Sequence, residues 1–123
     1  MAYSVRIVEF EGGKAAIVDS GERIIYDGQS ALDVIMDIGY TYECRRIVLR
    51  KEAIAEAFFD LATGVAGEIA QKFANYRYQV AVIGDFSRYG SKALQDYMYE
   101  CNLGGPLYFV GSEEEALGKL RGD

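Results

Sequence analysis

The sequence contains no histidine and no tryptophan, a single proline and only two cysteines. Without histidine, the chain lacks the commonest general base of enzymes and the commonest nitrogen ligand of zinc. Cys44 and Cys101 are isolated and show no CxxC spacing, so we interpret them as buried thiols of a reducing compartment. These residue types are insufficient for a standard catalytic or metal site, so we expect no cofactor and favour a non-enzymatic protein over an enzyme.

Long apolar runs are also missing. No stretch approaches the roughly 20 residues of a membrane-spanning helix, and no basic N-terminal segment leads into an apolar one. The formal net charge of −6 is unfavourable for binding phosphate backbones or anionic lipid. We therefore expect a cytoplasmic protein without nucleic-acid or membrane partners, and we interpret Arg45, Arg46, Arg50 and Lys51 as solvated surface.

Half of the 123 residues are hydrophobic, which is enough for the core of one domain spanning residues 1–123. The alternating, β-rich residues 4–10 and the apolar residues 15–18 flank a glycine-containing turn at 11–14. This pattern predicts an N-terminal β-hairpin, and residues 23–26 are compatible with a third extended segment.

The rest of the chain alternates between helical periodicity and short apolar runs. Ser30, with Asp33 three residues later, predicts the start of the first helix. Buried strands are predicted at residues 46–50, 79–84 and 107–110, and each is followed by a helical pattern. After the first of these strands, residues 53–59 are interpreted as a short turn. The next helix is predicted to begin near Thr63 or Gly64. The sequence therefore predicts an α/β fold with a mixed, mostly parallel sheet and about four helices.

Residues 60–64 read Asp-Leu-Ala-Thr-Gly and precede the predicted central helix. This turn and the element order resemble the sulfate-transporter and anti-sigma-factor-antagonist (STAS) domain over nearly the whole chain. In that family the turn reads Asp-Ser-Ser-Gly or similar, and phosphorylation of one hydroxyl switches partner binding. The resemblance implies a STAS-like topology and a phospho-acceptor at Thr63, although this turn has one hydroxyl and one inserted residue.

Longer stretches resemble a bacterial family known as domain of unknown function 4180. The stretches that carry this resemblance are residues 58–69, 71–76, 84–87, 99–102 and 114–117. The family's name implies no particular activity. The resemblance therefore supports the type of domain, and the function has to be inferred from individual residues.

Polar residues around the start of the central helix form one candidate site. Asp60 or Thr63 is suited to capping the helix, whereas the alternative is that Thr63 is phosphorylated or binds a partner. Three further polar residues follow at Glu68, Lys72 and Asn75, which either form a solvated helix face or extend a partner surface.

A second candidate site follows the strand that ends near Gly84. Asp85, Ser87 and Ser91 come after this strand, and Asp60 also follows a strand. Because strand carboxyl ends line the usual ligand crevice of an open α/β sheet, these residues predict a crevice for a ligand or cation. The alternative is that Asp85 stabilises a turn and Ser91 caps a helix.

Two functions follow from these sites. The first is a regulatory, protein-binding module that resembles anti-sigma factor antagonists and uses Thr63 and its neighbours. The second is a domain that binds a small molecule or cation, or an enzyme, at the crevice of Asp60, Asp85, Ser87 and Ser91. A homodimer, formed through exposed tyrosines or the hairpin edge, is compatible with both.

Overall fold

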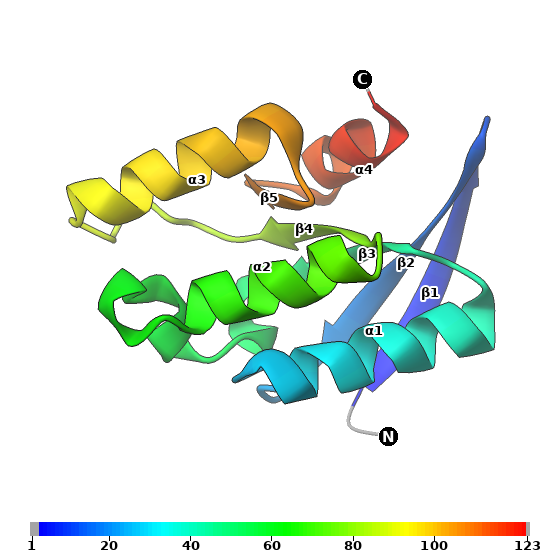
Figure 1. Ribbon diagram of the computed structural model, residues 1–123. Coiled ribbons are helices and arrows are strands. Elements are labelled where there is room, and N and C mark those ends of the chain that lie inside the picture. The colour runs from blue at the N-terminus through cyan, green and yellow to red at the C-terminus, as the bar shows by residue number, and fades with distance from the viewer. Residues whose placement is uncertain (1–2, 123) are drawn as a thin grey trace.

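A five-stranded sheet with the strand order β1-β2-β3-β4-β5 carries the fold, and the computed structural model describes residues 3–122 (Figure 1). The strands are β1 (Tyr3–Phe10), β2 (Gly13–Ser20), β3 (Arg46–Arg50), β4 (Gln79–Ile83) and β5 (Leu107–Val110). The α-helices are α1 (Gly28–Tyr42), α2 (Val65–Asn75), α3 (Lys92–Gly104) and α4 (Glu113–Arg121). The predicted order of elements is confirmed.

The N-terminal hairpin is antiparallel and longer than its apolar residues indicated. Its register runs from Tyr3 opposite Ser20 to Phe10 opposite Gly13, which leaves only residues 11 and 12 in the turn. Gly12 has φ 93°, a left-handed conformation that glycine adopts without steric cost. The prediction that the turn extends to Lys14 is therefore wrong, because Gly13 and Lys14 already pair within β2.

The remaining strands are parallel, so the predicted mixed, mostly parallel sheet is confirmed. Alternate residues of each strand face opposite sides of the sheet. Ile47, Leu49 and Val82 pack under α1, α2 and α3, whereas Val48 and Ala81 pack under α4. Both faces of the central strands are thus covered (Figure 1), which explains their continuous apolar runs. No helix within residues 3–122 is long and apolar enough to cross a membrane.

Helix α1 begins earlier than its sequence pattern indicated. Its N-cap is Asp27, whose side chain accepts a hydrogen bond of 2.8 Å from the backbone N–H of Ser30. The Ser30 hydroxyl in turn accepts from the backbone N–H of Asp27 at 3.1 Å, which completes a capping box. Ser30 is therefore the third residue of the helix, and its predicted role as the starting residue is wrong.

The segment between β3 and α2 differs most from the prediction. The expected short turn at 53–59 consists of 3₁₀ helices at Lys51–Ala53 and Glu56–Phe59, followed by another at Leu61–Thr63. A parallel bridge between Ile25 and Ile54 ties this segment to the chain that follows β2. The predicted extended segment at 23–26 is therefore reduced to this single bridge.

Candidate functional site

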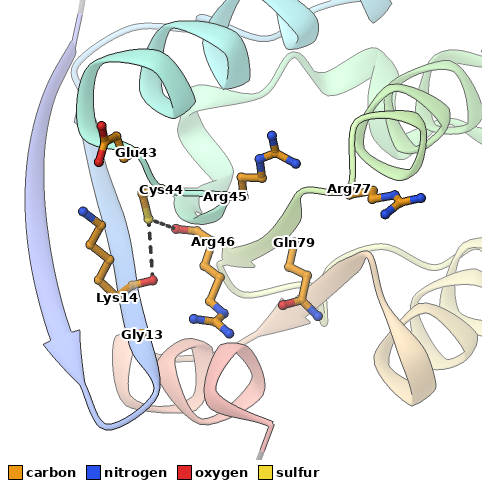
Figure 2. Close-up of a pocket in the computed structure, with 8 residues that line it drawn as sticks. All are labelled: Gly13, Lys14, Glu43, Cys44, Arg45, Arg46, Arg77 and Gln79. Carbon is orange, nitrogen blue, oxygen red and sulfur yellow. Dashed lines mark hydrogen bonds between the residues drawn. The ribbon is translucent and has the colours of Figure 1, made fainter.

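Cavities lie at both ends of the same three parallel strands, β2, β3 and β4. At their amino ends, which we name the amino edge, a cavity of about 390 Å³ is lined by residues that begin or precede these strands (Figure 2). At their carboxyl ends, the carboxyl edge, a crevice of about 430 Å³ is lined by residues that follow the strands. Ligands of open α/β sheets usually bind beyond the carboxyl ends, so this crevice is the candidate functional site.

Each of the three strands contributes to the carboxyl-edge crevice. Arg23 follows β2, Lys51 is the first residue after β3, and Asp85 and Arg88 follow β4. The complete lining is Arg23, Lys51, Glu52, Ile54, Glu56, Asp85 and Arg88. An adjoining open hollow shares Arg23, Glu56 and Arg88 and adds Tyr89.

Lys51 lines the carboxyl-edge crevice and is buried. Only 8% of the residue is exposed, so our interpretation of Lys51 as solvated surface is wrong. The neighbouring strand makes room for it: a Cβ at Gly84 would lie 2.8 Å from the Lys51 Cβ, closer than two such atoms approach. Glycine at the end of β4 therefore allows the buried lysine to lie against that strand.

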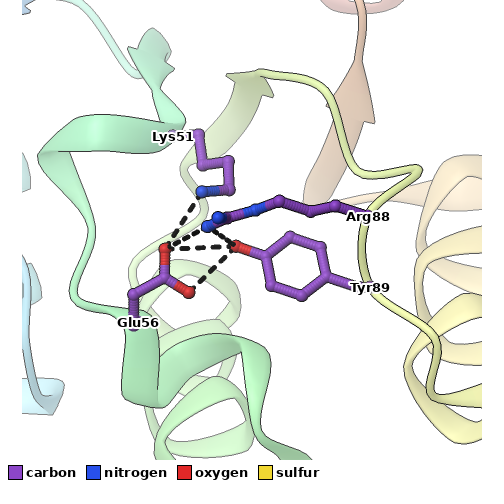
Figure 3. Close-up of polar contacts among 4 residues, drawn as sticks. All are labelled: Lys51, Glu56, Arg88 and Tyr89. Carbon is purple, nitrogen blue, oxygen red and sulfur yellow. Dashed lines mark hydrogen bonds and ion pairs between the residues drawn. The ribbon is translucent and has the colours of Figure 1, made fainter.

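The carboxylate of Glu56 joins the polar groups of the carboxyl edge (Figure 3). Its Oε1 lies 3.0 Å from Lys51 Nζ and 2.7 Å from an Nη of Arg88. The Tyr89 hydroxyl is 3.0 Å from the Glu56 Oε2, to which it donates, and the same Nη of Arg88 donates to this hydroxyl at 3.1 Å. Three side chains therefore donate to one carboxylate, which fixes the loop after β4 against the segment after β3.

Lys51 and Glu56 are both held in their charged forms. Burial opposes the charge on Lys51, but its contacts with Tyr89 and Glu56 outweigh burial and raise its pKa above the usual value. Burial likewise opposes the charge on Glu56, yet the donors Lys51 and Tyr89, with Arg88 nearby, lower its pKa. Catalytic acids and bases need a pKa near the working pH, whereas these shifts move both groups away from neutrality.

Two aromatic rings lie beside the ammonium group of Lys51. Its Nζ lies 5.4 Å from the ring centroid of Phe59 and 5.2 Å from that of Tyr89, and these two rings stack at 5.0 Å. Arg88 covers the same tyrosine at 4.9 Å. Cation–π contacts of this kind add to the ion pairs, so the Lys51, Glu56, Arg88 and Tyr89 side chains form a preorganised cluster, which we name the Glu56 cluster.

The structure places one of the four predicted crevice residues in the crevice. Asp85 lines it, and its carboxylate also accepts hydrogen bonds from the Ser87 backbone N–H and hydroxyl, which lower its pKa. Ser91 caps α3 through a hydrogen bond of 3.2 Å from the Leu94 N–H. Asp60 caps the 3₁₀ helix at Leu61–Thr63. The structure does not bring these four residues together around the crevice, and a ligand role for them stays a prediction.

Thr63 is exposed, and its hydroxyl organises the turn before α2. Its Oγ1 lies 2.8 Å from each of the carbonyl oxygens of Ala57 and Asp60, and it accepts from the Val65 N–H at 3.2 Å. Ala57 belongs to the 3₁₀ helix Glu56–Phe59. Thr63 therefore connects the start of α2 to the element that carries Glu56.

The predicted polar face of α2 is divided between different contacts. Glu68 accepts a hydrogen bond of 2.8 Å from the Gly28 N–H and so satisfies a free donor at the start of α1. Asn75 accepts from Gln71 on the same helix at 2.8 Å, and Lys72 is half-buried. Glu68 thus has a structural role in joining two helices, and partner binding by this face stays a prediction.

Sequence reasoning missed Glu56 and Arg88, interpreted Lys51 as solvated surface, and named Tyr89 only as one of several exposed tyrosines suited to an interface. A lysine between an arginine and a glutamate carries no sequence signal of burial, since lysine is normally exposed. The glycine after the apolar run of β4 was visible, but its meaning depends on which residue packs against it. Among residues 3–122, no group of three histidine, cysteine, aspartate or glutamate side chains is arranged to hold a metal ion.

A family model described as a domain of unknown function (DUF4180) matches residues 10–120. The chain belongs to the DUF4180 family. The matched region includes the whole Glu56 cluster and the turn at Thr63, so both lie within the DUF4180 domain. No curated protein matches the chain. Among solved structures, the DUF4180 chain is similar to one described as the anti-sigma factor antagonist SpoIIAA in its unphosphorylated form, with 13% identity, 99% of this chain and 100% of that chain covered, and a TM-score of 0.46.

Proposed function

We propose that this protein is a non-enzymatic, regulatory binding module that recognises a protein partner at the carboxyl edge of its sheet. The observation that carries the proposal is the Glu56 cluster, in which a carboxylate and a buried ammonium group neutralise each other. Such a pair is poorly suited to proton transfer, because neither group changes its charge near neutral pH. It is well suited to holding neighbouring side chains in one geometry.

The recognition groups are the guanidinium groups of Arg23 and Arg88. Both line the open hollow beside Tyr89, and the side chain of Arg88 is 60% exposed. Arg23 has no ion pair with any described carboxylate. Arginine and tyrosine are enriched at protein interfaces, and a guanidinium group binds a carboxylate through two parallel hydrogen bonds. The partner segment therefore presents a carboxylate to Arg23 and Arg88.

Regulation at Thr63 is the finer part of the proposal. Phosphorylation would remove the hydroxyl proton and place two negative charges beside the carbonyl oxygens of Ala57 and Asp60. The turn would lose its connection to the 3₁₀ helix Glu56–Phe59, and the Glu56 cluster would shift with it. Thr63 is exposed and so accessible to a kinase, and its hydroxyl is the group that holds the turn to the 3₁₀ helix.

Affinity capture from the source cell tests this function with matched variants. We expect one partner to bind the wild type and Thr63→Ser, which keeps the hydroxyl. The same partner should be lost from the Arg23→Gln/Arg88→Gln double variant and weakened by Thr63→Glu. Lys92→Gln removes an exposed charge on α3 and serves as the control. A partner that still binds the double variant, or the absence of any partner, contradicts the proposal.

A small-molecule site is the second candidate function. The carboxyl-edge crevice has a volume of about 430 Å³, within the range of small-ligand sites, and it is lined by both charge signs. A thermal-shift screen with nucleotides, metabolites, Mg²⁺ and Mn²⁺ tests it, because a ligand of the native state raises the melting temperature. A shift with a nucleotide or an anionic metabolite that disappears in Arg23→Gln supports this function, and an unchanged melting temperature across the panel contradicts it.

A further inference from the structure

The amino edge carries a second cavity with an unusual charge. Of the side chains that line it, Lys14, Arg45, Arg46 and Arg77 are cationic and Glu43 is the one carboxylate. This is an excess of three positive charges. Because the whole chain carries −6 and these residues carry +3, the remaining side chains sum to −9. An acidic protein thus concentrates positive charge at one end of its sheet.

These cations are not used to stabilise the fold through ion pairs. Within residues 3–122, none of the four forms an ion pair, whereas Arg6, Arg50, Lys51, Arg88 and Lys92 all do. Arg45 lies over the ring of Tyr78 at 5.7 Å and Arg46 over that of Phe10 at 5.5 Å. Both contacts leave the hydrogen-bond donors of the guanidinium groups available.

The partial negative charges of helix C-termini offset only part of the excess positive charge of the amino-edge cavity. Helices α1 and α2 both end at this edge, and a helix C-terminus behaves as about half a negative charge. Two such ends offset roughly one of the three excess positive charges. An excess of about two remains after this offset, which is the charge that a bound anion would neutralise.

The backbone is adapted to this cavity at three positions. Glu43 has φ 51° and Arg77 has φ 61°, and they are the only non-glycine residues within 3–122 with positive φ. Positions of this kind after a helix usually carry glycine or asparagine. In addition, a Cβ at Gly13 would overlap the guanidinium group of Arg46, so glycine makes room for that group. Strained charged residues therefore occupy places where the backbone alone favours glycine.

The arginines surround the cavity and do not meet at one point. Figure 2 shows Arg46 extending toward α4, Arg45 extending to the opposite side of the sheet, and Arg77 lying beside the cavity beyond Gln79. A ligand with two or more phosphate groups is suited to contacting guanidinium groups that lie apart in this way. Guanidinium groups bind phosphate oxygens in bidentate geometry, and a volume of about 390 Å³ admits a small molecule.

We propose that the amino-edge cavity binds a small ligand with at least two phosphate groups through Arg45, Arg46 and Arg77. Lys14 adds a fourth positive charge, and the Gln79 side-chain amide adds a hydrogen-bond donor. Glu43 opposes the ligand by repulsion and restricts binding to anions of high charge. This site is distinct from the carboxyl edge and does not depend on the function proposed there.

Calorimetric titration of the full chain with pyrophosphate at low salt tests the proposal. We expect pyrophosphate to bind, orthophosphate to bind more weakly, and Arg77→Gly to weaken pyrophosphate by at least about tenfold. Arg77→Gly replaces a strained residue with glycine, so the variant folds at least as well as the wild type, and lost binding cannot be explained by unfolding.

Three further variants make the test specific. Glu43→Gly relieves the same kind of strain but removes the opposing carboxylate, so it should tighten binding severalfold. Gly13→Ala keeps every charge and displaces only the flexible end of Arg46, so it should weaken binding. Lys92→Gln changes the net charge as Arg77→Gly does, at an exposed ion pair elsewhere, and should leave binding unchanged.

The following results would overturn the proposal: no heat of binding with pyrophosphate, equal affinity in wild type and Arg77→Gly, or orthophosphate binding as tightly as pyrophosphate. A short single-stranded DNA that binds the same arginines more tightly than pyrophosphate would also overturn it. In that case the positive charge would serve a nucleic-acid backbone, and not a small ligand.

Discussion

The cationic side chains at the two ends of strands β2, β3 and β4 differ in whether they form ion pairs. At the carboxyl edge, the cations Lys51 and Arg88 are both paired with one carboxylate, Glu56. At the amino edge, Arg45, Arg46 and Arg77 have no described carboxylate partner, and two backbone positions there are strained. The comparison teaches that similar residues can serve either the stability of the fold or the binding of a ligand. Lys51 is buried and its charge is paired with Glu56, so it serves the fold, whereas Arg88 is paired through one Nη and keeps its other donors for a partner.

The largest effect is expected from neutralising Glu56. Glu56→Gln leaves the buried Lys51 ammonium without a carboxylate, which should lower the free energy of unfolding by about 1–2 kcal/mol. The loss is smaller than for a fully buried pair, because the Glu56 side chain is 44% exposed. Urea unfolding measures it, and Asp96→Asn, which removes an exposed ion pair on α3, is the matched control with an expected loss below about 0.5 kcal/mol.

A double variant separates the ion pair from simple packing. Lys51→Met/Glu56→Gln removes the buried charge together with its partner, so it should recover part of the stability that Glu56→Gln loses. If the free energy of unfolding of the double variant is instead lower than that of Glu56→Gln, the loss comes from the packing of Lys51. The charges of the Glu56 cluster then do not act as a unit.

The same cluster predicts a pH dependence with a definite sign. The pKa of Glu56 is lower in the folded than in the unfolded chain, so its contribution to stability is complete above the unfolded pKa of about 4.3. This contribution is lost as the pH falls through the folded pKa. Wild type should therefore lose more stability than Glu56→Gln below about pH 5, measured by urea unfolding at several pH values. Parallel losses would show that Glu56 is not the titrating group.

At the amino edge, substitution should stabilise the protein. Arg77→Gly and Glu43→Gly each replace a left-handed residue with glycine, and each should raise the free energy of unfolding by about 0.5–1 kcal/mol. Removing a charged residue should therefore raise the free energy of unfolding at the amino edge and lower it at the carboxyl edge. A loss of stability in Arg77→Gly would mean that this arginine holds the fold, and that the amino edge resembles the carboxyl edge after all.

Most of the fold was accessible from the sequence, because it rests on local patterns. The apolar runs Ile47-Val48-Leu49 and Val80-Ala81-Val82-Ile83 predicted buried parallel strands, and the structure places them side by side. The start of α1 was misplaced because Asp27 and Ser30 are both good caps, and the sequence does not show which side chain reaches which N–H group.

The site was accessible only in outline. The rule that ligands gather at the carboxyl ends of strands depends on chain order alone and led to Asp85, which lines the carboxyl-edge crevice; a ligand role for Asp85 stays a prediction. The Glu56 cluster depends on how the 3₁₀ helices that follow β3 pack against the loop after β4, and no periodicity encodes that packing. Arg45 and Arg46 were visible as a basic pair, but Arg77 joins them only through the pairing of β3 with β4.

The smallest effect is expected from neutralising a single arginine, and it compares the two edges directly. Arg45→Gln removes only the contact with the Tyr78 ring, and it relieves repulsion from Arg46 and Arg77, so stability should change by less than about 0.5 kcal/mol. Arg88→Gln removes a donor from Glu56 and a contact with the Tyr89 ring, so it should lower the free energy of unfolding more than Arg45→Gln does. Urea unfolding of the two variants side by side decides the comparison. If Arg45→Gln costs as much as Arg88→Gln, the unpaired arginines are already supporting the fold, and the reason for assigning them to a phosphate ligand disappears.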